Sequence, residues 1–123
     1  MDAIRKKRIE AEIIRTLGTV FVSGKVKDPG IGMVSLHRAE LAEDLSVVKI
    51  WVTSYIEERE KGKFLTSLKR ASGFLQHILA KELKLRQTPR IVFKWDDNYI
   101  KSLEVNALID ELAPKVKDEP IDE

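Results

Sequence analysis

The chain of 123 residues is 43% hydrophobic and 34% charged, a balance typical of a globular protein that forms a single domain. No apolar run approaches the length that crosses a bilayer, and no apolar stretch of a signal peptide follows the basic N-terminus. The absence of cysteine excludes disulfides, thiolate nucleophiles and cysteine-based zinc sites, so we expect a cytoplasmic protein.

The net charge of +2 conceals a strong asymmetry along the chain. Residues 1–95 carry 19 Lys and Arg against 11 Asp and Glu, a net charge of +8, whereas residues 96–123 carry 3 against 9, a net charge of −6. A basic body with an acidic end is typical of a protein that binds a polyanion. On charge alone, an unevenly charged solvated surface is almost as good an interpretation.

Apolar residues recur at helical spacing between Ala3 and Val22, which predicts an amphipathic helix. These residues are Ile9, Ile13, Leu17 and Val20. Ser23-Gly24 offers a left-handed cap for this helix. Residues 25–32 contain one proline and two glycines and predict a turn-rich connector.

Two strands are predicted at residues 34–41 and 46–55. The second strand alternates between an apolar face and a mixed face, as a strand with one buried face does. The first strand does not keep a period of two, which a bulge near His37-Arg38 would explain. Because only four residues separate the strands, we expect an antiparallel hairpin.

Glu57–Glu60 opens a second helical region, whose apolar pattern is interrupted at Ala71-Ser72-Gly73. Adjacent Ser and Gly residues kink helices, so we favour two shorter helices over one straight helix. A helix beginning near Gly73 would present free backbone N–H groups beside Lys69 and Arg70, a suitable site for phosphate. Taken alone, however, the motif favours a kink that merely packs two helices.

Arg90–Trp95 predicts a third strand, and Tyr99–Leu112 predicts a last helix that Pro114 ends. The expected fold class is α+β, with the order α-β-β-α-kink-α-β and a three-stranded sheet with helices on one face. We expect one domain at residues 1–112 and an acidic, flexible tail at residues 113–123.

No pattern of catalytic residues is present. His37 and His77 lie on different predicted elements without a partner motif, so we interpret both as surface histidines with no chemical role. Asp96-Asp97 could pair as magnesium ligands, but adjacent acids after a strand are typical of turns. No phosphate-binding loop or dinucleotide fingerprint occurs. We therefore expect no enzyme, no metal, no cofactor and no small-molecule substrate.

The candidate RNA-binding residues are the predicted kink and the cations that could share its face. They are Arg5, Lys6, Lys7, Arg8, Lys69, Arg70, Ala71, Ser72, Gly73, Lys81, Lys84, Arg86 and Arg90. Phosphate contacts from such residues supply affinity, whereas sequence preference needs contacts with bases. Trp51 could stack on a base or pack against a neighbour at the sheet edge.

The order and spacing of several motifs resemble the bacterial ribosome-binding factor A family over residues 8–108. The motifs are Arg8-Ile9, Lys27–Met33, Asp44-Leu45, Lys49–Thr53, Ala71–Leu75, Arg86, Pro89 and Phe93–Asn98. The resemblance implies a type II KH-like fold in which the kink Ala71-Ser72-Gly73 replaces the usual Gly-x-x-Gly loop. One departure is Gly30, where the family commonly has arginine, so the resemblance does not carry a phosphate contact over to this position.

The resemblance also implies a function. Such a factor binds the free small (30S) ribosomal subunit and its 16S rRNA and assists late maturation, including processing of the 5′ end, most of all in the cold. We expect a monomer with no membrane partner. Two alternatives remain open: a KH-like module for another RNA, and a protein-interaction domain that binds an acidic partner.

Overall fold

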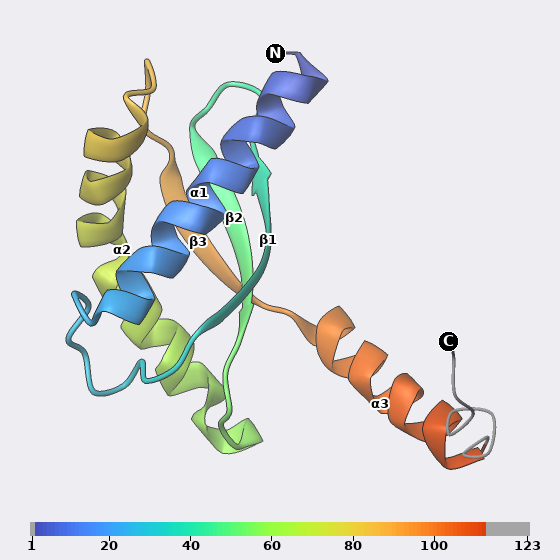
Figure 1. The fold of residues 1–123 in the computed structure, drawn as a ribbon. Helices are drawn as coiled ribbons and strands as arrows, with labels where there is room; N and C mark the ends of the chain where they lie inside the picture. The colour runs from blue at the N-terminus through green and yellow to red at the C-terminus, as the bar shows by residue number, and fades with distance from the viewer. Residues whose placement is uncertain (1, 113–123) are drawn as a thin grey trace.

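The computed structural model describes residues 2–112, in which two long helices cover one face of a three-stranded sheet (Figure 1). The elements are α1 (Ala3–Ser23), β1 (Ser35–Leu41), β2 (Val47–Thr53), the 3-10 turn η1 (Glu58–Glu60), α2 (Lys61–Leu83), β3 (Arg90–Trp95) and α3 (Asp97–Leu112). The α+β class and the predicted strands are confirmed. The predicted tail at residues 113–123 lies outside the described residues, so the domain boundary stays a prediction.

The sheet has the strand order β1-β2-β3. β1 and β2 form the predicted antiparallel hairpin, whereas β3 pairs with β2 in parallel, with α2 as the crossover. The register shifts between Leu36 and Arg38, which confirms the predicted bulge. The bulge restores the alternation of β1, so that Ala39 and Leu41 face the same side as the buried residues of β2.

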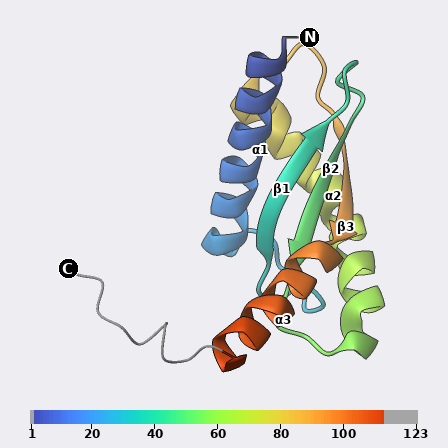
Figure 2. The same cartoon turned by 90° about the vertical axis from the view of Figure 1, so that its right-hand side faces the viewer.

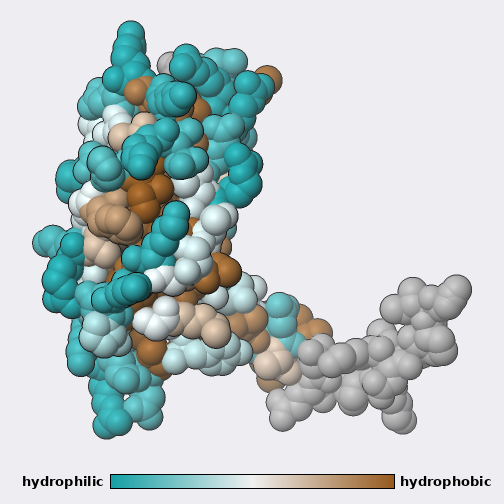
Figure 3. Space-filling model, turned by 60° about the vertical axis from the view of Figure 1, so that its left-hand side comes forward, coloured by the Kyte–Doolittle hydropathy of each residue, from teal (hydrophilic) through white to brown (hydrophobic). Residues whose placement is uncertain are grey.

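The core lies between the sheet and the two long helices. α1 contributes the four apolar residues that its helical spacing predicted, and all four are buried. β2 contributes Val48, Ile50 and Val52, each with 0% of its surface exposed. Burying an aliphatic side chain of this size contributes about 1.5–3 kcal/mol, so this layer holds the fold together. The outer surface of the helical side is hydrophilic around an apolar strip in its middle (Figure 3).

α1 begins and ends where its capping residues dictate. The side chain of Asp2 accepts a hydrogen bond from the backbone N–H of Ile4, 3.2 Å away, and so caps the first turn. Gly24 ends the helix with φ of 78°, a left-handed conformation that glycine adopts without strain. The predicted Ser23-Gly24 cap is confirmed.

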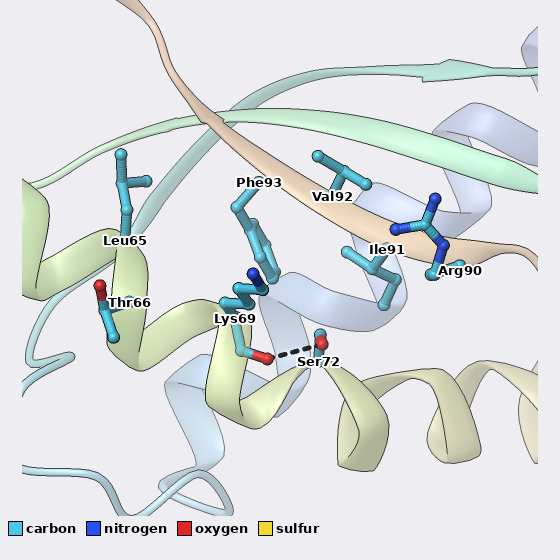
Figure 4. Close-up of a pocket in the computed structure, with 8 residues that line it drawn as sticks. All are labelled: Leu65, Thr66, Lys69, Ser72, Arg90, Ile91, Val92 and Phe93. Carbon is cyan, nitrogen blue, oxygen red and sulfur yellow. Dashed lines mark hydrogen bonds between the residues drawn. The ribbon is translucent and has the colours of Figure 1, made fainter.

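α2 corrects the prediction of two separate helices. It is one continuous α-helix of 23 residues, and its axis bends where Ser72 lies (Figures 1 and 4). The Ser72 hydroxyl donates a hydrogen bond to the Lys69 carbonyl, 2.7 Å away, a type of bond that bends helices without ending them. Gly73 is therefore not the first residue of a helix, and the expected phosphate site on free N–H groups is wrong.

α3 begins two residues earlier than predicted and leads away from the body beyond one end of the sheet (Figure 2). Its first turn is fixed by Asp96, which is only 5% exposed and whose carboxylate accepts a hydrogen bond from the Tyr99 backbone N–H at 2.9 Å. Leu103, Val105 and Leu108 are about half exposed, at 48%, 54% and 53%. This helix is thus anchored at its start and unpacked along these side chains.

Candidate nucleic-acid interface

A groove of about 490 Å³ lies between α2 and the edge strand β3 (Figure 4). α2 lines it with Leu65, Thr66, Lys69 and Ser72, and β3 lines it with Arg90, Ile91, Val92 and Phe93. Three predicted site residues, Lys69, Ser72 and Arg90, therefore meet here although they are up to 21 positions apart in the sequence. The fold brings them together because β3 returns alongside α2.

The groove combines an apolar floor with cations on both walls. Lys69 and Arg90 are exposed, and neither forms an ion pair with any residue between 2 and 109. Such cations keep their charge available for an anionic ligand. The half-buried apolar side chains of Leu65 and Phe93 offer surface to a ring or sugar rather than to a second charge. This is a site that an RNA strand fits better than a small ion does.

Arg70 has a structural partner, unlike Lys69. Its Nε and Nη2 atoms donate to Oδ2 of Asp28 at 3.0 and 2.8 Å, which ties the connector to α2. The other oxygen of Asp28 accepts from the Gly30 backbone N–H at 2.9 Å. The Gly30 N–H and the Arg70 guanidinium hold the pKa of Asp28 below its ordinary value of 3.8. Arg70 therefore positions the connector, a role that the sequence reasoning missed.

Gly30 allows the connector to approach α2 closely. A Cβ atom on Gly30 would overlap the hydroxyl of Ser67, a buried residue of α2. Ser67 also accepts a hydrogen bond from Arg70 Nη2 at 3.2 Å. The departure from the family pattern at position 30 thus has a steric reason in this chain. The Asp-Pro-Gly sequence was the signal that could have revealed it.

The remaining residues of the predicted kink differ in their surroundings. Ala71 and Ser72 are half-buried and Gly73 is exposed. A Cβ atom on Gly73 would meet nothing within 4 Å, and its φ is not in the left-handed region. A side chain at Gly73 would therefore neither clash with a neighbour nor strain the backbone. Because glycine has no side chain, the helix backbone at this position is open to a ligand.

The N-terminal cations form a second cluster at another part of the surface. Arg5 of α1 and Arg86 of the α2–β3 loop line one hollow together with Glu43 and Asp44. Lys6 pairs with Glu43 at 3.5 Å. Lys7 lines a neighbouring hollow, and the other predicted site residues outside the groove, Arg8, Lys81 and Lys84, are exposed. The candidate RNA-binding cations therefore fall in the groove, in this cluster and at separate exposed positions.

His37 is not the plain surface histidine that we expected. It lies at the bulge of β1, where its Nε2 atom is 2.7 Å from Oγ1 of the buried Thr53. Its ring stacks on Tyr99 with the centroids 3.9 Å apart. The side chain therefore attaches the start of α3 to the sheet. His77 is exposed, as expected.

Comparison with known proteins identifies the family of this chain. Residues 5–109 match the family model of ribosome-binding factor A. The chain belongs to the ribosome-binding factor A family. Ribosome-binding factor A of Leptospira biflexa is 45% identical over 115 residues, which cover 94% of this chain and 77% of the relative. That of Halothermothrix orenii is 34% identical and covers 97% of this chain and 93% of the relative.

Solved structures of ribosome-binding factor A agree with this assignment. The crystal structure of the Thermus thermophilus protein superposes with a TM-score of 0.62 at 29% identity, covering 72% of this chain and 93% of that one. A homology model of the same protein, fitted into the cryo-electron microscopy map of its 30S complex, gives a TM-score of 0.58 at 28% identity, covering 72% and 92%. The family that the sequence resembles and the α+β fold class are therefore confirmed. In the described part of this chain, no helix is long and apolar enough to span a membrane.

Proposed function

We propose that this chain is an assembly factor of the small ribosomal subunit. It binds the free 30S subunit through 16S rRNA in the cytoplasm and assists late maturation, including processing of the 5′ end, without catalysing a reaction. Family membership supports this proposal, as does the Thermus relative placed in a map of a 30S complex. The observation that carries it is the groove, where Lys69 and Arg90 stand on opposite walls of an apolar floor.

The groove suits an RNA strand that is not fully paired. Lys69 and Arg90 would each bind a phosphate, while a sugar or base would lie on the floor near Phe93. A protein that binds one RNA conformation more tightly than the others shifts the population toward that conformation. Binding energy alone can therefore promote maturation, and no catalytic group is required. Trapped RNA conformations persist longest in the cold, where such a shift would matter most.

Sedimentation with ribosomal particles tests the proposal. We expect the protein, as a monomer, to bind isolated free small subunits and to leave intact ribosomes largely unbound. The double variant Lys69→Gln and Arg90→Gln should lose most of this binding, because both side chains are exposed and their replacement leaves the core intact. The double variant Lys25→Gln and Lys27→Gln removes equal charge from the exposed connector and should bind nearly as the unaltered protein does.

Two other outcomes would favour the alternatives. Tight binding to isolated oligonucleotides, without preference for free small subunits, would indicate a KH-like module for another RNA. No salt-dependent retention on purified RNA, together with capture by an acidic protein, would indicate a protein-interaction domain. Either result would contradict the assembly-factor proposal.

A further inference from the structure

The sheet has a face that α1 and α2 leave uncovered, and we call it the open face (Figure 2). Side chains alternate along a strand, so the buried Val48, Ile50 and Val52 place Lys49 and Trp51 on the opposite side. The strand pairing then adds neighbours from β1 and β3. Together with their register partners, Lys49 and Trp51 form a set of six residues on the open face: Arg38, Glu40, Lys49, Trp51, Val92 and Lys94.

These residues form two rows across the three strands. One row is Arg38, Trp51 and Lys94, which are register partners on β1, β2 and β3. The next row is Glu40, Lys49 and Val92. These six residues include three cations and one anion. None of the three cations makes an ion pair with a described residue, although Glu40 lies opposite Lys49 in the register.

Arg38 lies over the ring of Trp51. Its Cζ atom is 3.6 Å from the centre of the Trp51 ring, and Arg38 is exposed while Trp51 is half-buried. The indole therefore holds the guanidinium in place and leaves its outer side to solvent. Guanidinium planes are surfaces on which unpaired bases stack in RNA complexes. A preorganised side chain loses less conformational entropy when it binds.

The open face adjoins both basic regions described above. Arg90, which lines the groove, is the register partner of Val47. Val47 lies on the same side of β2 as Lys49 and Trp51, so Arg90 borders the open face as well. At the other edge of the sheet, Arg38 and Lys7 line one hollow. Glu10, Glu40 and Glu43 also line this hollow. The path of cations therefore runs from the groove around the edge of β3 and across the open face, and carboxylates interrupt it before the start of α1.

We propose that the open face is a second RNA-binding surface, on which Arg38 stacks on an unpaired base while Lys49 and Lys94 bind the flanking phosphates. This inference rests on the proposed function, because it extends the RNA contact of the groove to the opposite side of the same sheet. A domain that contacts RNA on both sides holds two segments at a fixed separation, which one groove cannot do.

Photo-crosslinking identifies what lies on the open face. Lys49 or Lys94, both exposed, is replaced by photoreactive p-benzoylphenylalanine in the full chain, which is then irradiated in complex with purified free small subunits. We expect adducts that ribonuclease destroys and that map to 16S rRNA. Adducts destroyed only by protease would mean that the face docks on a ribosomal protein, and the absence of adducts would mean that it faces solvent. Either result overturns the inference.

Binding measurements test the assigned chemistry. The double variant Lys49→Gln and Lys94→Gln should bind free small subunits on the order of tenfold more weakly and show a shallower salt dependence, by about 0.7 in slope for each phosphate that is no longer neutralised. Arg38→Lys keeps the charge but removes the planar group, so it should lower affinity with little change in slope. Circular dichroism and thermal unfolding of each variant test whether it is folded.

Two controls separate this inference from the proposed function. The double variant Lys25→Gln and Lys27→Gln should change affinity much less, and an equal loss would show that only total charge matters, which overturns the inference. If Lys69→Gln with Arg90→Gln abolishes binding while the open-face variants bind normally, the proposed function stands and this inference fails. If the unaltered protein does not bind free small subunits, both fail.

Discussion

At the scale of single residues, the site depends on contacts that hold the connector against α2. Asp28 accepts hydrogen bonds from Gly30 and Arg70, and these donors lower its pKa below 3.8 in the folded protein. A carboxylate whose pKa is lowered by folding stabilises the protein above its unfolded pKa, and this stabilisation is lost as pH falls through the folded value. The same contacts fix the position of Arg70, which sequence reasoning assigned to RNA.

The first prediction concerns acid stability. Asp28→Asn should lower the melting temperature at pH 7 and have progressively less effect as the pH is lowered below about 4, because the unaltered carboxylate is then itself protonated. Thermal unfolding between pH 2.5 and 7 measures this. Asp44→Asn is the comparison away from the connector. Hydrogen bonds from Ser46 also lower the pKa of Asp44, so this variant should show the same trend with pH. A constant difference at all pH values would contradict the assigned contact.

The second prediction concerns Gly30. Gly30→Ala should destabilise the fold by about 1–3 kcal/mol, the usual cost of overpacking, because the new Cβ would overlap the Ser67 hydroxyl. Ser67→Ala removes that hydroxyl, so the double variant should recover part of the loss. Urea unfolding of the two single variants and the double variant gives the coupling free energy. Additive losses would show that Gly30 and Ser67 do not meet.

At the scale of elements, α2 is the helix on which the site depends. Because it is continuous through Gly73, a substitution there acts on an exposed helix position and not on a turn. Gly73→Ala should therefore stabilise the protein by about 0.5–1 kcal/mol. The same variant should weaken binding to free small subunits if RNA contacts the bare backbone. Urea unfolding and sedimentation of the one variant measure both effects.

Gly62 provides a matched control for the prediction at Gly73. Gly62, also exposed and without neighbours within 4 Å, lies in the first turn of the same helix. Gly62→Ala should leave binding unchanged. If both variants bind normally, the bend in α2 serves packing alone. If Gly73→Ala unfolds the protein, the continuous helix is the wrong description of this segment.

The elements also show how far sequence reasoning reaches. Periodicity predicted α1, the hairpin and its bulge, because each depends on residues close together in the chain. The prediction of two helices that meet at Ala71-Ser72-Gly73 was wrong. Ser and Gly indicate a weak point in a helix, but they do not show whether packing keeps the helix continuous. Buried Leu68 and Leu75, on either side of this segment, hold both halves of α2 against the sheet. The groove partners Lys69 and Arg90 could not be paired from sequence, because their proximity depends on the crossover to β3.

At the scale of the whole molecule, the charge asymmetry predicts how binding depends on salt and on the acidic segment. The net charge of +8 falls on residues 1–95, which hold the groove, the N-terminal cluster and the open face. The net charge of −6 falls on the segment that begins at the end of β3. If phosphate contacts dominate affinity, binding to free small subunits should fall steeply with salt, and the acidic segment should oppose it.

The last prediction follows from this division. Removal of the residues beyond Pro114 deletes 2 Lys against 4 Asp and Glu, so the net charge of the chain rises by two. Affinity for free small subunits should therefore stay the same or rise, most clearly at low salt, where electrostatic screening is weakest. Sedimentation at several salt concentrations measures this. As a control, a variant with these four acids and two lysines changed to Asn or Gln has the same net charge as the truncated chain and should match it at each salt concentration. If the truncated protein does not bind while the neutralised variant does, these residues are a recognition element. The charge of the body alone would then not explain binding.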